Sequence, residues 1–101
     1  MTFTNAEVAQ DYLKRLERER GEMPFWYHFF KFNEEAGEIH REFLRWQGLH
    51  RSGRVGQDKF AEELADAVIT LYAIADMYTI DLDAQIQKKH TVLMTRSMKE
   101  E

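Results

Sequence analysis

The sequence predicts a single all-α domain over residues 1–101. One proline and five glycines in 101 residues are too few for a sheet rich in turns. A hydrophobic content of 44% with seven Phe, four Tyr and two Trp excludes a disordered chain. Two stretches also repeat apolar residues at steps of four and three, the spacing of one helix face. A chain of 101 residues can bury only a modest hydrophobic core, so we expect oligomerisation to supplement it.

The first two of four expected helices have recognisable ends. Thr4 and Glu7 have the spacing of a capping box, which starts a helix near residue 5. Gly21 is a natural stop for that helix. Pro24 suits a first helical turn, where its missing N–H costs nothing, so a second helix is expected over about 25–46.

The second half of the chain predicts a loop and two further helices. Residues 47–57 hold three glycines and no apolar periodicity, which is typical of a loop. Asp58 can cap a third helix that runs to about residue 79, and Asp81 can cap a fourth. The uncharged run 67–75 indicates that the third helix is buried nearly all round.

Each of the two central helices carries one apolar seam beside a cluster of acids. The seams consist of Phe25, Phe29, Phe32, Ala36, Ile39, Phe43 and Trp46, and of Phe60, Leu64, Ala67, Leu71, Ile74 and Tyr78. At about 100° per residue, Glu35 and Glu63 lie roughly 60–70° from the centre of their seams, and Glu38 and Asp66 roughly 120–130°, turned the same way. If the helices pack side by side, we expect these four carboxylates to meet on one face.

Four carboxylates within a few ångströms repel one another and require a counter-charge. None of the four histidines follows a glutamate by three residues, and the chain has no cysteine, so di-iron and soft-metal sites are not indicated. Oxygen ligands favour a hard ion, and Mg²⁺ shared with substrate phosphate is the usual arrangement. The alternative is a solvated acidic face paired with lysines and arginines.

Charged residues outside this cluster suggest further roles. Glu34 and Glu62 lie roughly opposite the seams, at about 160–170°, just outside the acidic face. Lys89 and Arg96 lie two turns apart on the fourth helix and could present two cations to phosphates, although cations late in a helix also simply favour its dipole.

The overall charge and hydropathy pattern exclude some classes of function. A net charge of −4 argues against nucleic-acid binding, which needs a basic surplus. The start of the chain does not resemble a secretory signal, and no stretch has the length of a membrane span. We therefore expect a soluble cytoplasmic protein that does not bind membranes.

The order of these motifs resembles the MazG-like family of all-α nucleoside triphosphate pyrophosphohydrolases. The similarity covers roughly residues 25–96. It rests on Lys31-Phe32-Asn33-Glu34-Glu35-Ala36-Gly37-Glu38, on Glu62-Glu63-Leu64-Ala65-Asp66, and on Asp81-Leu82-Asp83 before a last helix that bears Lys and Arg.

The resemblance implies a four-helix bundle that assembles as a homodimer or homotetramer. It implies hydrolysis of (d)NTP to (d)NMP and pyrophosphate with Mg²⁺, or Mn²⁺ in its place, as housekeeping of the nucleotide pool. By position, the metal ligands would be Glu35, Glu38, Glu63 and Asp66, and phosphates would be met by Lys31, Lys89 and Arg96. Glu34 matches the first acid of the motif, as a further ligand or as the base toward water. Glu62 is the second candidate for orienting the water, and the motif match favours Glu34.

One departure and two alternatives remain open. Relatives often have Asn where this chain has Leu93, which leaves the substrate undecided. The same acids would serve a phosphoribosyl-ATP pyrophosphohydrolase. A non-catalytic helical partner is the third reading, but a purely structural bundle gains nothing from clustered like charges.

Overall fold

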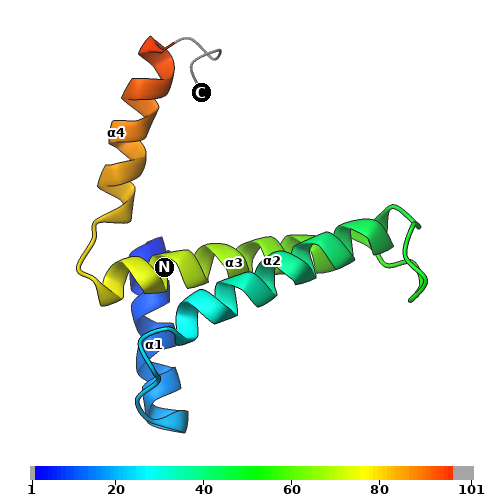
Figure 1. Ribbon diagram of the computed structural model, residues 1–101, viewed down its shortest axis with the longest axis horizontal. Coiled ribbons are helices and arrows are strands. Elements are labelled where there is room, and N and C mark those ends of the chain that lie inside the picture. The colour runs from blue at the N-terminus through cyan, green and yellow to red at the C-terminus, as the bar shows by residue number, and fades with distance from the viewer. Residues whose placement is uncertain (1, 97–101) are drawn as a thin grey trace.

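The structure, a computed structural model, describes residues 2–96, and its regular secondary structure over that range is helical. Four helices follow one another: α1 (Asn5–Arg20), α2 (Tyr27–Trp46), α3 (Gln57–Met77) and α4 (Leu82–Thr95). α1 and α2 each pack against α3, whereas α4 leaves this three-helix unit and projects away from it (Figure 1). The all-α prediction is confirmed, but one chain does not by itself close a four-helix bundle.

The two ends of α1 are those that the sequence predicts. The Thr4 hydroxyl accepts from the Glu7 N–H at 3.1 Å, and the Glu7 carboxylate accepts from the Thr4 N–H at 3.0 Å, which completes the capping box. At the other end Gly21 has φ +79°, and its N–H reaches the carbonyl of Glu17 at 2.8 Å. Glycine adopts this backbone conformation without the steric cost of a Cβ.

The starts of α2 and α3 differ from the prediction. Pro24 precedes α2 instead of lying in its first turn, and its carbonyl accepts from the Tyr27 N–H at 3.0 Å. Gly56, not Asp58, is the N-cap of α3, so Asp58 lies within the first helical turn. A carboxylate in the first turn also interacts favourably with the helix dipole, so an aspartate near a helix start is compatible with either position.

Small side chains allow α1 to approach α3 closely. Ala9 and Ala73 have no exposed surface, and together with Tyr72 they form the buried core between the two helices. Tyr12 and Leu13 pack against this cluster from the next turn of α1. The face of α1 that contains Ala9 is therefore fixed against α3.

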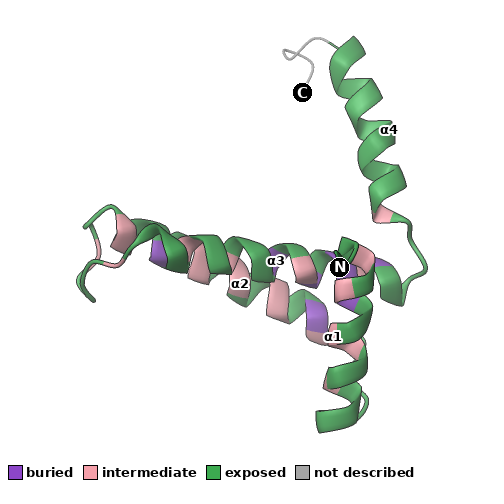
Figure 2. Cartoon of the chain, turned by 180° about the vertical axis from the view of Figure 1, so that it is seen from behind, coloured by how far each residue is buried: buried purple, intermediate pink, exposed green. Residues whose placement is uncertain are grey.

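α3 is less enclosed than predicted. Within the uncharged run, Val68 and Leu71 keep 43% and 40% of their surface exposed. The reason is that α1 and α2 cover only part of α3, and α4 does not close the remainder (Figure 2). One chain therefore leaves an apolar surface on its central helix.

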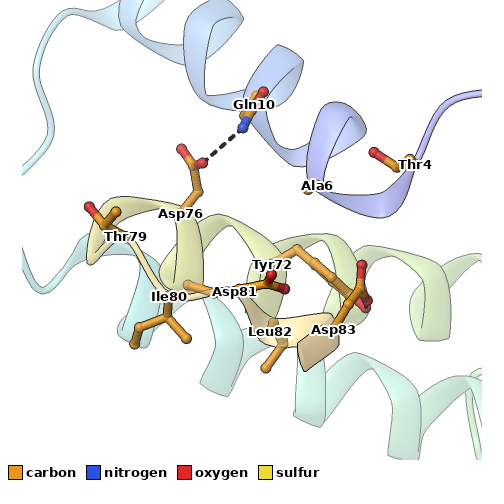
Figure 3. Close-up of a pocket in the computed structure, with 11 residues that line it drawn as sticks. Thr4, Ala6, Gln10, Tyr72, Asp76, Thr79, Ile80, Asp81, Leu82 and Asp83 are labelled. Carbon is orange, nitrogen blue, oxygen red and sulfur yellow. Dashed lines mark hydrogen bonds between the residues drawn. The ribbon is translucent and has the colours of Figure 1, made fainter. Parts of the chain in front are cut away.

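The start of α4 is tied to α3 by one hydrogen bond and by Leu82, which packs against the buried cluster. Asp81 accepts from the Ala84 N–H at 3.0 Å and caps α4 as predicted, while the Tyr72 hydroxyl donates to Asp83 at 2.5 Å. A hollow of about 560 Å³ lies here, beside the Gln10 to Asp76 hydrogen bond of 3.1 Å that links α1 to the end of α3 (Figure 3). Beyond Leu82, every described residue of α4 is exposed.

Across the described residues, each helix is either too short or too polar to cross a bilayer.

Candidate metal centre

Aromatic pairs at both ends of the α2 and α3 pairing set the register in which the acids meet. Phe29 lies against Tyr78 at one end, with ring centroids 6.4 Å apart, and Phe43 against Phe60 at the other, at 5.6 Å. Trp46 stacks on Phe60 at 5.6 Å. The helices are therefore antiparallel, and the acidic motifs lie between the two aromatic contacts.

Three of the four predicted metal ligands come together in this central section. Glu35 of α2 and Glu63 and Asp66 of α3 offer carboxylate oxygens that all lie within 4.8 Å of one another. Glu35 is the most buried of the three and Asp66 the most exposed. We call these three residues the acidic triad.

The triad is electrostatically strained. The pKa of Glu63 is raised, first by burial and then by the neighbouring charges of Asp66 and Glu35. Glu38 adds a smaller contribution in the same direction. A cation among these oxygens would remove the repulsion, which gives the triad a reason to bind one.

Glu38 lies near the triad but is paired elsewhere. Its carboxylate is 2.7 Å from Nη2 of Arg41, one turn further along α2. The same guanidinium also lies 3.2 Å from the carboxylate of Glu42, which is 97% buried and held on its other side by Arg45 at 3.2 Å. Of the four carboxylates expected to meet, three therefore form the triad, and the fourth, Glu38, takes its counter-charge from Arg41.

The donor set fits a hard divalent cation. Mg²⁺ binds oxygen at 2.0–2.1 Å in octahedral geometry, so opposite ligands lie about 4 Å apart and adjacent ones about 3 Å apart. Carboxylate oxygens up to 4.8 Å apart would have to approach one another by up to about 1.8 Å to occupy adjacent positions around such an ion. Exposure of Asp66 leaves room for water or substrate oxygens to complete the coordination.

The two candidate bases are each paired with a lysine of their own helix. Glu34 is 3.5 Å from the ammonium of Lys31, and Glu62 is 3.7 Å from that of Lys59, each pair lying on a single helix. Both carboxylates are more than half exposed. Neither belongs to the acidic triad, and their role toward water stays a prediction.

A cleft of about 350 Å³ opens beside the triad, and α1 forms one of its walls. It is lined by Val8, Tyr12, Lys31, Glu35, Asp66, Ile69 and Thr70. Lys31 thus shares a space with two triad carboxylates. The sequence did not identify Val8, Tyr12 or Ile69 as site residues, because apolar side chains at helical spacing look the same in a core and in the wall of a cleft.

Lys89 and Arg96 are not part of this cleft. Lys89 belongs to α4 and Arg96 ends it, and α4 extends away from the three-helix unit (Figure 1). Both side chains are exposed. In this arrangement they therefore cannot contact phosphates bound at the triad of the same chain.

No family model matches the chain, and no curated protein or solved structure compared with it is similar. The resemblance to MazG-like enzymes thus remains a prediction from the motifs.

Proposed function

We propose that the protein is a Mg²⁺-dependent nucleoside triphosphate pyrophosphohydrolase that converts (d)NTP to (d)NMP and pyrophosphate, as housekeeping of the cytoplasmic nucleotide pool. The observation that supports this most is the acidic triad, in which carboxylates from the Glu-Glu-x-x-Glu and Glu-x-x-Asp motifs meet within 4.8 Å. The adjoining cleft supports it further, because a ligand there would touch the triad and Lys31 together.

In this proposal Glu35, Glu63 and Asp66 would hold Mg²⁺ or Mn²⁺, and Glu38 would be available as a fourth ligand if it released Arg41. A divalent ion bound there would neutralise charge on the phosphate oxygens and orient them. Glu34 or Glu62 orients the water that attacks the α-phosphorus in line with the leaving pyrophosphate. Lys31 stabilises negative charge on the phosphates from the same side of α2.

The proposal includes assembly of at least two chains. Apolar residues of α4, among them Ile86 at 49% and Leu93 at 39% exposure, keep a large part of their surface exposed within the described part of the chain, and so do Val68 and Leu71 of α3. Contiguous exposed apolar surface on a small domain marks an interaction site. A homodimer or homotetramer would cover these faces, and Lys89 and Arg96 would then meet the triad of another copy.

The test is an assay of pyrophosphate and phosphate release from a panel of (d)NTPs and from phosphoribosyl-ATP, with and without Mg²⁺. We expect Mg²⁺-dependent release of pyrophosphate from at least one (d)NTP, with the (d)NMP as the other product. Turnover of phosphoribosyl-ATP alone would change the substrate. Absence of hydrolysis in all cases, from a folded protein, would rule out the proposed function.

A further inference from the structure

A second hollow adjoins the triad cleft on the side of α1. It has a volume of about 260 Å³ and shares Tyr12 and Lys31 with the cleft. Its polar lining consists of Tyr12, Arg15, Glu19 and Arg20 of α1, and of Tyr27 and Lys31 of α2. We call it the basic hollow, because three of these six residues are cations.

The charges of the basic hollow act on one small space. The pKa of the Tyr12 phenol is raised, first by burial, next by the Tyr27 phenol and also by the Glu35 carboxylate of the triad, whereas Lys31 and Arg20 lower it. Both cations and both phenols are therefore close enough to influence the same hydroxyl. Ammonium, guanidinium and phenol groups are all hydrogen-bond donors, and such a group of donors suits a phosphate.

Two carboxylates compete for these cations only weakly. Arg15 is paired with Glu19 at 3.2 Å, and Lys31 with Glu34 at 3.5 Å. Both are exposed pairs within one helix, and such pairs contribute little to stability. A phosphate could displace either carboxylate at small cost.

The basic hollow continues directly from the triad. Lys31 lies one helical turn before Glu35, so the two side chains are neighbours on α2. Both line the triad cleft, and Lys31 also lines the basic hollow. A phosphate chain with one end at the triad would reach the basic hollow past Lys31.

We propose that the basic hollow binds the terminal phosphates of the substrate and the pyrophosphate product, with Lys31 and Arg20 as the principal cations. The inference rests on the proposed function for the identity of the substrate. It assigns to α1 the role that helical position alone suggested for Lys89 and Arg96.

The experiment measures binding of inorganic pyrophosphate by isothermal titration calorimetry, with Mg²⁺ at fixed ionic strength. The variants are Arg20→Gln and Lys31→Gln, and the matched control is Arg18→Gln. Arg18 lies in the same last turn of α1 and carries the same charge, but it does not line the hollow. We expect Arg20→Gln and Lys31→Gln each to weaken binding about tenfold, as for loss of a charge-assisted hydrogen bond, and Arg18→Gln to stay within about twofold of the parent.

Further arms separate this inference from the proposed function. Equal pyrophosphate affinity of Arg20→Gln and Arg18→Gln would overturn the inference, even if the parent hydrolyses (d)NTP. If Lys89→Gln loses pyrophosphate binding while Arg20→Gln binds pyrophosphate as tightly as the parent, the inference is overturned and the cations of α4 form the site. If the parent binds pyrophosphate through Arg20 but hydrolyses no nucleotide, the anion site stands and the proposed function fails. Thermal unfolding of each variant shows whether it is folded.

Discussion

Carboxylates of the three-helix unit and cations of α4 are predicted by the sequence to meet in one site, but the structure brings only the carboxylates together. The carboxylates of α2 and α3 meet within 4.8 Å, whereas the cations Lys89 and Arg96 lie on a helix that leaves the unit. Helical phase predicts which residues meet when two helices pack along each other. It cannot predict the direction of a helix set by a short connection, such as residues 78–81 before α4.

The largest expected effect concerns the triad itself. Glu63→Gln and Asp66→Asn should each reduce (d)NTP hydrolysis by at least about 10³-fold, because each removes a charged ligand from the metal. Initial rates of pyrophosphate release at saturating Mg²⁺ measure this. Asp58→Asn, an equal charge change in the first turn of α3, should leave the rate within about twofold of the parent. Near-normal activity of either triad variant would show that the ligand assignment is wrong.

The next effect concerns the exposed face of α4. Ile86→Glu places a charge on the apolar surface that is proposed to meet another copy, so association should weaken by at least about 100-fold. Light scattering after size-exclusion chromatography, over a range of protein concentrations, measures the change. Gln87→Glu adds the same charge at the neighbouring position and should assemble normally. A parent protein that is monomeric at every concentration would remove the second copy from the proposal.

Stability without metal should change in the opposite direction to activity. Because the folded-state pKa of Glu63 is raised, its protonated form contributes stability that is present at low pH and is lost as pH rises through that pKa. At pH 7, Glu63→Gln should therefore raise the melting temperature by about 2–6 °C in EDTA, since it relieves repulsion in a half-buried site. Melting curves between pH 4 and pH 8 should show the gain shrink toward acid. Saturating Mg²⁺ should stabilise the parent and not the variant.

The smallest effect concerns the joint that connects the two regions. Tyr72→Phe removes the hydrogen bond to Asp83 and should cost about 0.5–1.5 kcal/mol in urea unfolding. Amide hydrogen exchange should accelerate in the first turn of α4, while the start of α1 should exchange as in the parent. Uniform acceleration in both helices would mean that the bond supports the whole core and not the joint.

Local signals in the sequence were sufficient for most of the fold. The Thr4 capping box, Gly21 and Asp81 each fixed a helix end through contacts within a few residues. Asp58 and Pro24 were placed wrongly by only a turn or less, because neighbouring positions at a helix start satisfy the same chemistry. Such errors did not change the phase of the acids.

Features that depend on distant contacts were not predictable. The Glu38 pairing is an exception, since Arg41 lies only three residues along the same helix; the helical phase of the acids alone did not take this local ion pair into account. The place of Val8 and Tyr12 in the wall of the cleft depends on where α1 packs on α3, and the contact of Ala9 with α3 sets this position. Leu71 is 40% exposed because α1 and α2 cover only part of α3, an arrangement that depends on how separate helices pack.

Thr79, in the connection that follows α3, has a left-handed backbone conformation with φ +55°. A β-branched residue is a steric outlier there, and Asn or Gly adopts the same conformation at lower cost. A single substitution of Thr79 could thus change the flexibility of the connection to α4 without altering the sequence of either α3 or α4. The direction in which α4 leaves the three-helix unit therefore depends in part on the backbone of this one residue.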